Sequence, residues 1–396
     1  MVKISKRAQA MPASPLRKLV GLAEERKKQG IKVYHLNIGQ PDIKTPEIYY
    51  KTLRNFSENP VAYSPSTGRM EINFAWEKYF STVGIDLATN EIITTSGGSE
   101  ALILAMCAVA DPGDEILGFE PFYTNYNGFG SIGGIKIKAV PLNIKNGFHL
   151  PPDKEIKKRI TKKTKALIFT NPSNPTGTVY TKPELQRLVN IALKHNLFII
   201  ADETYREFSF TGEKCFSLMC FPEAKEHVIL VDSASKRFNV CGARIGCLAS
   251  HNVEIMQAVL KFCMARLSVS TIEQLALVPI LSNSKKYIAP VIKEYKKRRD
   301  VVYEGLKQIK EATFSKPEGA FYIIVGLPIK SSEHFAKWLI EKFDYKGETV
   351  LLAPAPGFYA TKGLGENEVR IAYVLKSQDL ERALFIVKKA LEHYNR

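Results

Sequence analysis

The sequence predicts an α/β protein with a large domain built on a largely parallel sheet, followed by a smaller α+β domain. Three short runs rich in Val, Ile, Leu and Phe, at 165–170, 197–203 and 227–233, indicate strands. The segment 182–195 between the first two runs carries apolar residues at helical spacing. Unbroken apolar strands separated by helices are typical of a parallel sheet that is buried on both faces.

The pattern changes in the C-terminal part of the chain. Residues 283–310 predict one long helix that is interrupted near Pro290. Strand and helix patterns follow at 319–327, 332–343, 350–358, 369–375 and 378–394, which together form a unit of domain size. A chain of 396 residues is long enough for two domains. We predict an N-terminal segment at 1–44 that packs with the small domain, a large domain at 45–282, and a long helix plus small domain at 283–396.

The composition limits the classes of partner. A formal net charge of +16 raises the question of nucleic-acid binding. The lysines are dispersed over helix-like stretches such as 154–165 and 285–297, and dispersed lysines of this kind usually form solvated helix faces. We therefore expect no nucleic-acid partner. An anionic substrate or cofactor suits a basic protein equally well.

The cellular compartment is predicted from three absences in the sequence. The first residues lack the apolar core of a signal peptide, and no apolar stretch reaches the ~20 residues that a membrane span needs. The six cysteines form no C-x-x-C pair and have no histidine at zinc-finger spacing. Thiols in such settings are usually buried and reduced. We expect a cytoplasmic protein with no membrane contact and no metal site.

A glycine-rich turn precedes the apolar helix pattern that begins near residue 97. Gly97, Gly98, Ser99 and Glu100 stand where the free N–H groups and the positive dipole end of a helix can bind phosphate. The alternative is an ordinary helix start, with Ser99 as the N-cap and Glu100 in the first turn.

Polar residues follow each of the three apolar runs. Asn171, Asp202 and Ser233 stand at the predicted carboxyl ends of parallel strands, where the chemistry of such sheets collects. The Asn-Pro steps in 171–177 force an irregular loop, and a buried Asp202 requires a cationic or donor partner. Each of these patterns alone also fits a plain turn or a common strand end.

Lys236 and Arg244 complete a set of groups with one chemical use. Lys236, which we expect at the end of the third strand, can form a Schiff base with the aldehyde of pyridoxal 5′-phosphate (PLP). Arg244 and the helix start at Gly98 suit its phosphate, and Asp202 suits its pyridine nitrogen, which a carboxylate keeps protonated. The residues therefore predict a PLP site.

Nine short motifs give the chain its resemblance to a known family. They are NIGQPD (37–42), YSPSTG (63–68), GGSEA (97–101), PFY (121–123), NPSNPTG (171–177), DETY (202–205), SASKRFNVCGARIG (233–246), GAFY (319–322) and VRIAY (369–373). In order and spacing they resemble the class I aminotransferases of PLP fold type I over essentially the whole chain, and are similar to bacterial aspartate aminotransferases. The resemblance implies a mixed, mainly parallel sheet in the large domain and a homodimer with active sites at its interface.

The resemblance also implies a role for individual residues. Lys236 holds the cofactor and shuttles the proton, Asp202 pairs with the pyridinium nitrogen, and Arg370 clamps the substrate α-carboxylate with help from Asn174 and the backbone at Gly39. The resemblance further implies that Asn174 and Tyr205 contact the phenolic oxygen of PLP and that Tyr123 covers the ring face. The residues implied at the phosphate are Gly98, Ser99, Glu100, Ser233 and Arg244, with Tyr63 at the phosphate of the neighbouring subunit.

The implied reaction is ping-pong transamination between an L-amino acid and a 2-oxo acid such as 2-oxoglutarate. We favour aspartate as donor, while aromatic, alanine and branched-chain donors stay open. Some aspartate-specific relatives carry a lysine where this chain has Ser99, so Arg17 or Arg266 would have to bind a distal carboxylate. A structural or solvated arginine is the alternative at both positions.

Two other classes keep parts of the same site. A PLP-dependent carbon–sulfur lyase of the same fold would keep Lys236, Asp202 and Arg370, and would release pyruvate and ammonia without an oxo-acid acceptor. A non-catalytic PLP-binding regulator would need a DNA-binding domain, for which the N-terminal segment is too short.

Overall fold

The computed structural model describes residues 2–12 and 18–394 of the chain. A seven-stranded sheet forms the centre of the larger unit, in the order β2-β8-β7-β6-β5-β3-β4. Strand β8 pairs antiparallel with both of its neighbours, and the other pairs are parallel. The sheet is therefore mixed and mainly parallel, as predicted. Its strands are β2 (Ile92–Thr95), β3 (Glu115–Glu120), β4 (Lys136–Pro141), β5 (Thr164–Thr170), β6 (Phe198–Asp202), β7 (Val228–Ser233) and β8 (Gly246–Ala249).

Alternate side chains of the central strands enter two separate cores, one on each face of the sheet. Leu167 and Leu230 pack on one face with the helices α4 (Met70–Thr82), α8 (Lys182–His195) and α11 (Thr271–Ser282). Ile168 and Ile229 pack on the other face with α5 (Gly97–Val109), α6 (Asn125–Gly133) and α10 (Val253–Arg266). The unbroken apolar runs arise because both faces of each strand are buried.

Two helix starts bear on the sequence predictions. Helix α8 has the predicted bounds, and it begins with a capping box in which Thr181 and Glu184 satisfy each other's backbone N–H groups. Helix α5 begins at Gly97, so Ser96 is its N-cap residue and Ser99 lies in the first turn. The alternative in which Ser99 caps this helix is therefore wrong.

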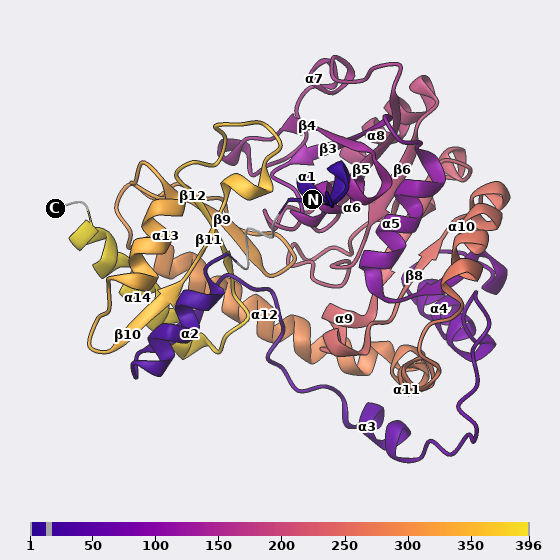
Figure 1. The fold of residues 1–396 in the computed structure, drawn as a ribbon, viewed down its shortest axis with the longest axis horizontal. Coiled ribbons are helices and arrows are strands. Elements are labelled where there is room, and N and C mark those ends of the chain that lie inside the picture. The colour runs from indigo at the N-terminus through magenta and orange to yellow at the C-terminus, as the bar shows by residue number, and fades with distance from the viewer. Residues whose placement is uncertain (1, 13–17, 395–396) are drawn as a thin grey trace.

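The second unit combines both ends of the chain (Figure 1). Strand β1 (Lys32–His35) pairs in parallel with β10 (Glu348–Leu351), which joins residues more than three hundred positions apart. Strands β11 (Ala353–Pro354), β12 (Glu368–Ala372) and β9 (Tyr322–Gly326) form an antiparallel sheet. Helices α2 (Val20–Lys28), α13 (Ser332–Glu341) and α14 (Ser377–Tyr394) pack around these strands.

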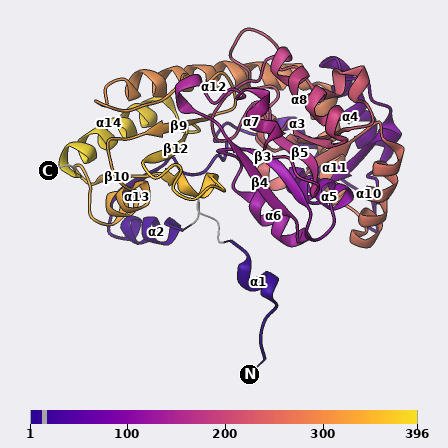
Figure 2. The same cartoon turned by 90° about the horizontal axis from the view of Figure 1, so that it is seen from above.

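Helix α12 (Ser284–Leu306) runs from the larger unit to the second one (Figure 1). The predicted interruption near Pro290 is wrong, because the helix continues through this residue. Ile288 and Val291 on either side are buried in the cores of the two units, and this packing offsets the hydrogen bond that Pro290 cannot donate. Short helices complete the chain: α1 (Lys6–Ala10), which contacts α6 and projects from the body (Figure 2), α3 (Glu47–Arg54), α7 (Asp153–Lys157) and α9 (Ala234–Arg237).

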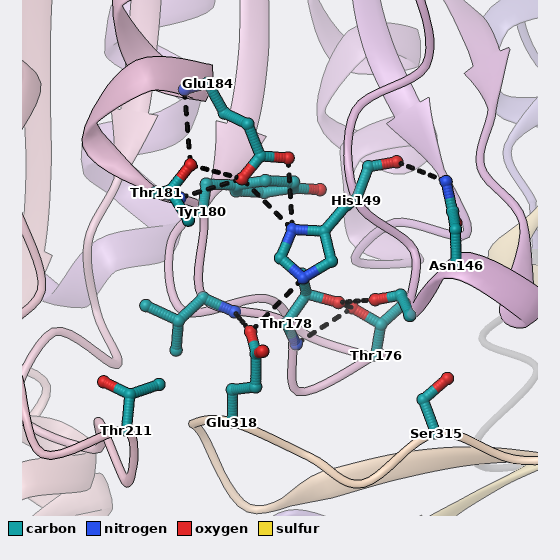
Figure 3. Close-up of polar contacts among 12 residues, drawn as sticks. Asn146, His149, Thr176, Thr178, Tyr180, Thr181, Glu184, Thr211, Ser315 and Glu318 are labelled. Carbon is teal, nitrogen blue, oxygen red and sulfur yellow. Dashed lines mark hydrogen bonds and ion pairs between the residues drawn. The ribbon is translucent and has the colours of Figure 1, made fainter.

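A histidine between two carboxylates ties the two units together (Figure 3). Nδ1 of His149 lies 3.1 Å from Glu184, the first-turn glutamate of α8. Nε2 of the same ring lies 3.5 Å from Glu318, in the loop that leads into β9. Glu318 also accepts a hydrogen bond from the backbone N–H of Val179, at 3.1 Å. This contact fixes the segment that precedes Tyr322.

Candidate active site

A cavity of about 770 Å³ opens at the carboxyl ends of β5, β6 and β7. This position is expected for a ligand site in a mainly parallel sheet, and the volume suits a small molecule. The N-terminus of α5 forms one side, and residues of the second unit close another. The predicted site residues that line the cavity are Gly39, Gly98, Ser99, Tyr123, Asn174, Asp202, Tyr205, Ser233, Lys236, Arg244 and Arg370.

Lys236 lies on the one-turn helix α9, directly after β7. The strand ends at Ser233, not at the lysine, and the Ser233 hydroxyl accepts the N–H of Ser235 at 3.2 Å to cap the turn. The Lys236 amine donates to the carbonyl oxygen of Gly39 at 2.9 Å. No carboxylate of the described residues pairs with this amine, so it remains available for a ligand.

Asp202 ends β6 and points its carboxylate into a set of donors. It accepts from the N–H of Thr204 at 3.2 Å, from the hydroxyl of Thr204 at 2.7 Å, and from the hydroxyl of Tyr126 at 3.1 Å. Burial raises the pKa of Asp202, and these hydrogen bonds oppose that rise by favouring the charged form. A cation in the cavity would favour the charged form of Asp202 further.

The start of α5 and Arg244 form an anion-receptive corner. Gly97 has a φ of +75°, and a Cβ at this residue would lie 2.5 Å from Nη2 of Arg244, so the close approach requires glycine. Among the described residues, Arg244 donates to the carbonyl oxygens of Cys241 and Ser96, at 3.1 and 3.4 Å. Within residues 2–12 and 18–394, no carboxylate lies within ion-pair distance of it. The corner therefore combines a helix N-terminus with an unneutralised guanidinium.

Arg370 is 1% exposed and also lacks a carboxylate partner among the described residues. Its guanidinium donates to Oδ1 of Asn174 at 3.1 Å and to the carbonyl oxygen of Asn37 at 2.6 Å. It lies between the rings of Tyr322 and Phe358, at 4.4 and 4.9 Å from their centroids. Burial lowers the pKa of Arg370. A buried cation in this setting is stabilised when an anionic ligand reaches it.

Three aromatic residues shape the space between these groups. The hydroxyls of Tyr205 and Tyr322 lie 2.8 Å apart. A Cβ at Gly39 would overlap the Tyr322 hydroxyl, which explains the glycine at that position. Tyr123 lines the cavity, its hydroxyl accepts from Asn125 at 2.9 Å, and burial raises its pKa to about 12.

Three of the described site residues lie outside this group. The Glu100 carboxylate accepts the Ser96 N–H at 2.7 Å and pairs with Nε of Arg266 at 3.1 Å, so both side chains are engaged with each other beside the cavity. Tyr63 is 82% exposed. Arg17 lies outside the residues that the structure describes.

Sequence reasoning missed three residues that shape the site. Thr204 and Tyr322 stand inside the quoted motifs DETY and GAFY, so their positions were available as a signal. Tyr126 reaches Asp202 from α6, and no local pattern marks it as different from other buried tyrosines.

The residues present fit PLP. The cavity offers an amine without a carboxylate partner, a buried carboxylate and an anion-receptive corner, which match the aldehyde, the pyridine nitrogen and the phosphate of the cofactor. Arg370 adds a second guanidinium at the cavity that has no carboxylate partner among the described residues. None of the helices in the described part of the chain is long and apolar enough to cross a membrane.

Comparison with known proteins supports the same interpretation. The family described as aminotransferase class I and II matches residues 31–385. A probable aspartate aminotransferase of Methanocaldococcus jannaschii is 33% identical over 401 residues, which cover 98% of this chain and 100% of that protein. The structure of an aspartate aminotransferase from Thermus thermophilus with maleate has a TM-score of 0.88 at 30% identity, covering 98% of this chain and 100% of that one. An alanine aminotransferase from Pyrococcus furiosus has a TM-score of 0.90 at 30% identity, covering 99% and 100%.

Fold, cavity chemistry and full-length similarity thus agree, and the chain belongs to the class I and II aminotransferases as a PLP-dependent transaminase.

Proposed function

We propose that this aminotransferase transfers the amino group of an L-amino acid, with aspartate as the favoured donor, to a 2-oxo acid such as 2-oxoglutarate. The observation that carries the proposal is the meeting of Lys236, Asp202 and Arg370 in one cavity. When bound, PLP supplies an aldehyde that condenses with amines and a ring that accepts electrons from the substrate carbon. The residues of the chain provide binding, orientation and proton transfer.

Lys236 is the group that moves the proton. Its amine would hold the cofactor at the aldehyde carbon and would serve as the general base for the proton on the substrate α-carbon. Asp202 keeps the pyridine nitrogen protonated through its negative charge. The distance of 2.9 Å between the Lys236 amine and the Gly39 carbonyl supports a fixed position for this base.

The remaining residues orient the cofactor. Asn174 and Tyr205 would hold its phenolic oxygen, and Tyr123 would cover one ring face. The first-turn N–H groups of α5 at Gly98, Ser99 and Glu100 would bind the phosphate, together with Ser233 and Arg244. The engagement of the Glu100 carboxylate with Arg266 leaves its backbone N–H as the group that serves the phosphate.

Arg370 binds the substrate α-carboxylate, assisted by Asn174 and the backbone at Gly39. Two N–H groups of a guanidinium match the two oxygens of a carboxylate. The Nε of Arg370 is buried and has no hydrogen-bond partner among the described residues. This free donor supports a ligand with an acceptor in that direction.

The preference for aspartate rests on relatives that carry this activity in their names, while one structural neighbour is an alanine aminotransferase. A second substrate carboxylate requires another cation. Arg266 is paired with Glu100 within one chain, so it would have to act on the site of a neighbouring subunit, and Arg17 is the other candidate.

We further propose a homodimer in the cytoplasm. Val61, Tyr63, Met70, Phe74, Met264 and Leu267 are 54–82% exposed in the single chain, and large apolar side chains of this number usually meet a partner surface. The segment that contains Val61 and Tyr63 is hydrogen-bonded to the start of α11, which follows Met264 and Leu267. The Thr271 hydroxyl donates to the Ala62 carbonyl, and the Gln274 side chain accepts the N–H of Arg69. A dimer through this surface would bring Tyr63 to the neighbouring active site. The division into 1–44, 45–282 and 283–396 stays our proposal for the domains.

A donor panel tests this proposal. Purified protein with PLP is assayed with aspartate, alanine and phenylalanine, each with 2-oxoglutarate, and Lys236→Ala is the inactive control. Borohydride reduction followed by peptide mapping is expected to label Lys236, and a label on another lysine would contradict its role. Release of pyruvate and ammonia without an acceptor would identify the carbon–sulfur lyase instead. Arg266→Ala is expected to depress aspartate more than alanine, and equal loss for both would remove Arg266 from the substrate site.

A further inference from the structure

Four charged side chains form a buried cluster directly behind the turn that carries Lys236. Glu203, Arg206, Asp232 and Arg237 are each no more than 4% exposed, and we call them the buried charge cluster. They lie on the face of the sheet covered by α4, opposite the cavity. The guanidinium of Arg237 lies 4.5 Å from the ring centroid of Tyr79 in that helix, and that of Arg206 lies 5.5 Å from the ring centroid of Phe80.

The cluster consists of two ion pairs with no net charge. Arg206 pairs with Glu203, and Arg237 pairs with Asp232. The two pairs are linked by a longer contact of 3.9 Å between Arg206 and Asp232. Burying four charges is costly, and replacing such pairs by apolar residues is often neutral or stabilising. Stability alone therefore does not explain the cluster, and its location calls for a further reason.

Asp232 contacts the chain on both sides of Lys236. Its Oδ1 accepts the backbone N–H of Ser233 at 2.6 Å, and the same oxygen pairs with Nη2 of Arg237. Ser233 precedes the one-turn helix α9, and Arg237 is its last residue. A single carboxylate oxygen thus joins the two ends of the turn that holds the lysine.

Helix α9 has only four residues and needs such anchors. A single helical turn fixes several dihedral angles for one hydrogen bond and is unstable by itself. Its start is held by the Ser233 hydroxyl and by a hydrogen bond from the Ala234 N–H to Ile245, at 3.1 Å. Arg237 is the charged side chain that ties its end to the sheet. The Glu203–Arg206 pair is similarly buried but belongs to the loop that follows β6, outside α9.

We propose that Asp232 and Arg237 are positioning residues that fix the Lys236 amine in the cavity, an inference that rests on the role proposed above for Lys236. Lys236 points to the cavity, while its neighbour Arg237 points to the opposite side and is locked there by Asp232. The turn therefore cannot rotate without breaking a buried ion pair. Rotation of α9 would move the amine away from the substrate carbon.

The proposal predicts an effect on turnover and not on substrate binding. The substrate carboxylate meets Arg370, which the change leaves intact, so KM should stay within about threefold. A shift of the base by about 1 Å can lower kcat by roughly 100-fold. Freed from its fixed contact with Gly39, the Lys236 amine should also react faster with an amine-directed reagent.

The experiment compares two paired replacements. Asp232→Asn/Arg237→Met removes the pair that flanks the lysine, and Glu203→Gln/Arg206→Met removes the matched pair that does not. Each exchange removes both charges at once, which avoids leaving a lone buried charge. For each protein, kcat and KM are measured with PLP. Labelling of Lys236 by an acetylating reagent is measured in the PLP-free protein, relative to the exposed Lys194, by mass spectrometry.

The first pair is expected to lower kcat by about 10- to 100-fold and to raise the relative labelling of Lys236 at least about threefold. Because the second pair is linked to Asp232 through the longer contact of 3.9 Å, it is expected to lower the melting temperature with less than about a threefold change in kcat or in labelling. Equal effects of both pairs, or unchanged kcat and labelling in the first, would overturn the proposal. If the Asp232→Asn/Arg237→Met protein does not fold, Arg237→Lys is measured in its place. The shorter lysine side chain should give an intermediate loss of kcat. Wild-type values of kcat and of Lys236 labelling in this variant would overturn the proposal. Inactivity of Lys236→Ala is tested separately, so failure of the Lys236 assignment is distinguishable from failure of this one.

Discussion

Arg370 donates a hydrogen bond from Nη1 to Oδ1 of Asn174 at 3.1 Å, and this contact joins the two units at the cavity. Arg370 belongs to β12 of the second unit, and Asn174 belongs to the loop after β5 of the larger one. The guanidinium is also held by the Asn37 carbonyl and by two aromatic rings. It is therefore oriented before a substrate arrives, which reduces the entropy lost on binding.

Arg370→Ala is expected to weaken every amino donor. All donors carry an α-carboxylate, and a charge-assisted contact of this kind contributes roughly 1.5–3 kcal/mol, about 10- to 150-fold in kcat/KM. The measurement is kcat/KM for aspartate, alanine and phenylalanine. Arg382→Ala is the matched control, because Arg382 pairs with Glu348 in the same unit, away from the cavity. A loss confined to one donor would contradict a role in binding the α-carboxylate.

Asp202→Asn is expected to lower kcat by at least about tenfold with little change in melting temperature. The amide keeps the size of the side chain but loses the charge that we propose keeps the pyridine nitrogen protonated, and one pKa unit corresponds to about 1.4 kcal/mol. Thr204→Val removes one donor to the carboxylate and should give a smaller loss. Near-normal kcat in Asp202→Asn with PLP still bound would argue against the role assigned to this residue.

The central fold could be predicted from the sequence because local pattern and burial agree there. The runs at 165–170, 197–203 and 227–233 are strands since both of their faces are covered, and 182–195 is a helix with its predicted bounds. Pro290 is the exception, because sequence rules place a break at a proline within a helix. The helix continues here since Ile288 is buried in the core of the larger unit and Val291 in the core of the second unit.

The site was predictable only where the motif residues themselves face the cavity. The contact between Tyr126 and Asp202 depends on the placement of α6, which packs on α5 and β4, and the pairing of Glu100 with Arg266 depends on the packing of α10 beside α5. Such contacts join residues far apart in sequence, so no local spacing indicates them. The turn at Lys236 has the same origin, since Asp232 bonds both of its ends through a side chain.

The contact between the units at His149 should depend on pH (Figure 3). Hydrogen bonds to Glu184, and then to Glu318, raise the pKa of His149 to about 10. A histidine with a raised folded-state pKa stabilises the fold fully below its unfolded value of about 6.5, and this contribution is lost as the pH rises to about 10. His149→Gln is therefore expected to lower the melting temperature most at acidic and neutral pH, with the difference shrinking toward the alkaline end.

Thermal unfolding of wild type and His149→Gln over this pH range measures the effect. The exposed His195 at the end of α8 supplies the control, because its ring has no carboxylate partner among the described residues, and the effect of His149→Gln is measured relative to that of His195→Gln. A difference between wild type and His149→Gln that stays constant across the range would mean that the imidazole acts without its charge.

The last prediction concerns the apolar surface around Tyr63. Phe74 is 58% exposed on α4 and Met264 is 57% exposed on α10, and in a two-fold dimer each substitution would occur twice in one interface. Burying a large apolar side chain contributes roughly 1.5–3 kcal/mol, so Phe74→Asp should raise the dimer dissociation constant by at least about 100-fold when both copies are counted. Sedimentation velocity over a concentration series measures this change. Phe385→Asp, on α14 of the second unit and 38% exposed, is the control and should leave the assembly unchanged. Because the Tyr63 hydroxyl is expected to reach the phosphate of the neighbouring site, dissociation should also weaken PLP retention, and Tyr63→Phe, which keeps the apolar ring, should weaken it without dissociating the dimer. A wild-type protein that sediments as a monomer at all concentrations while keeping full activity would contradict both parts of this prediction.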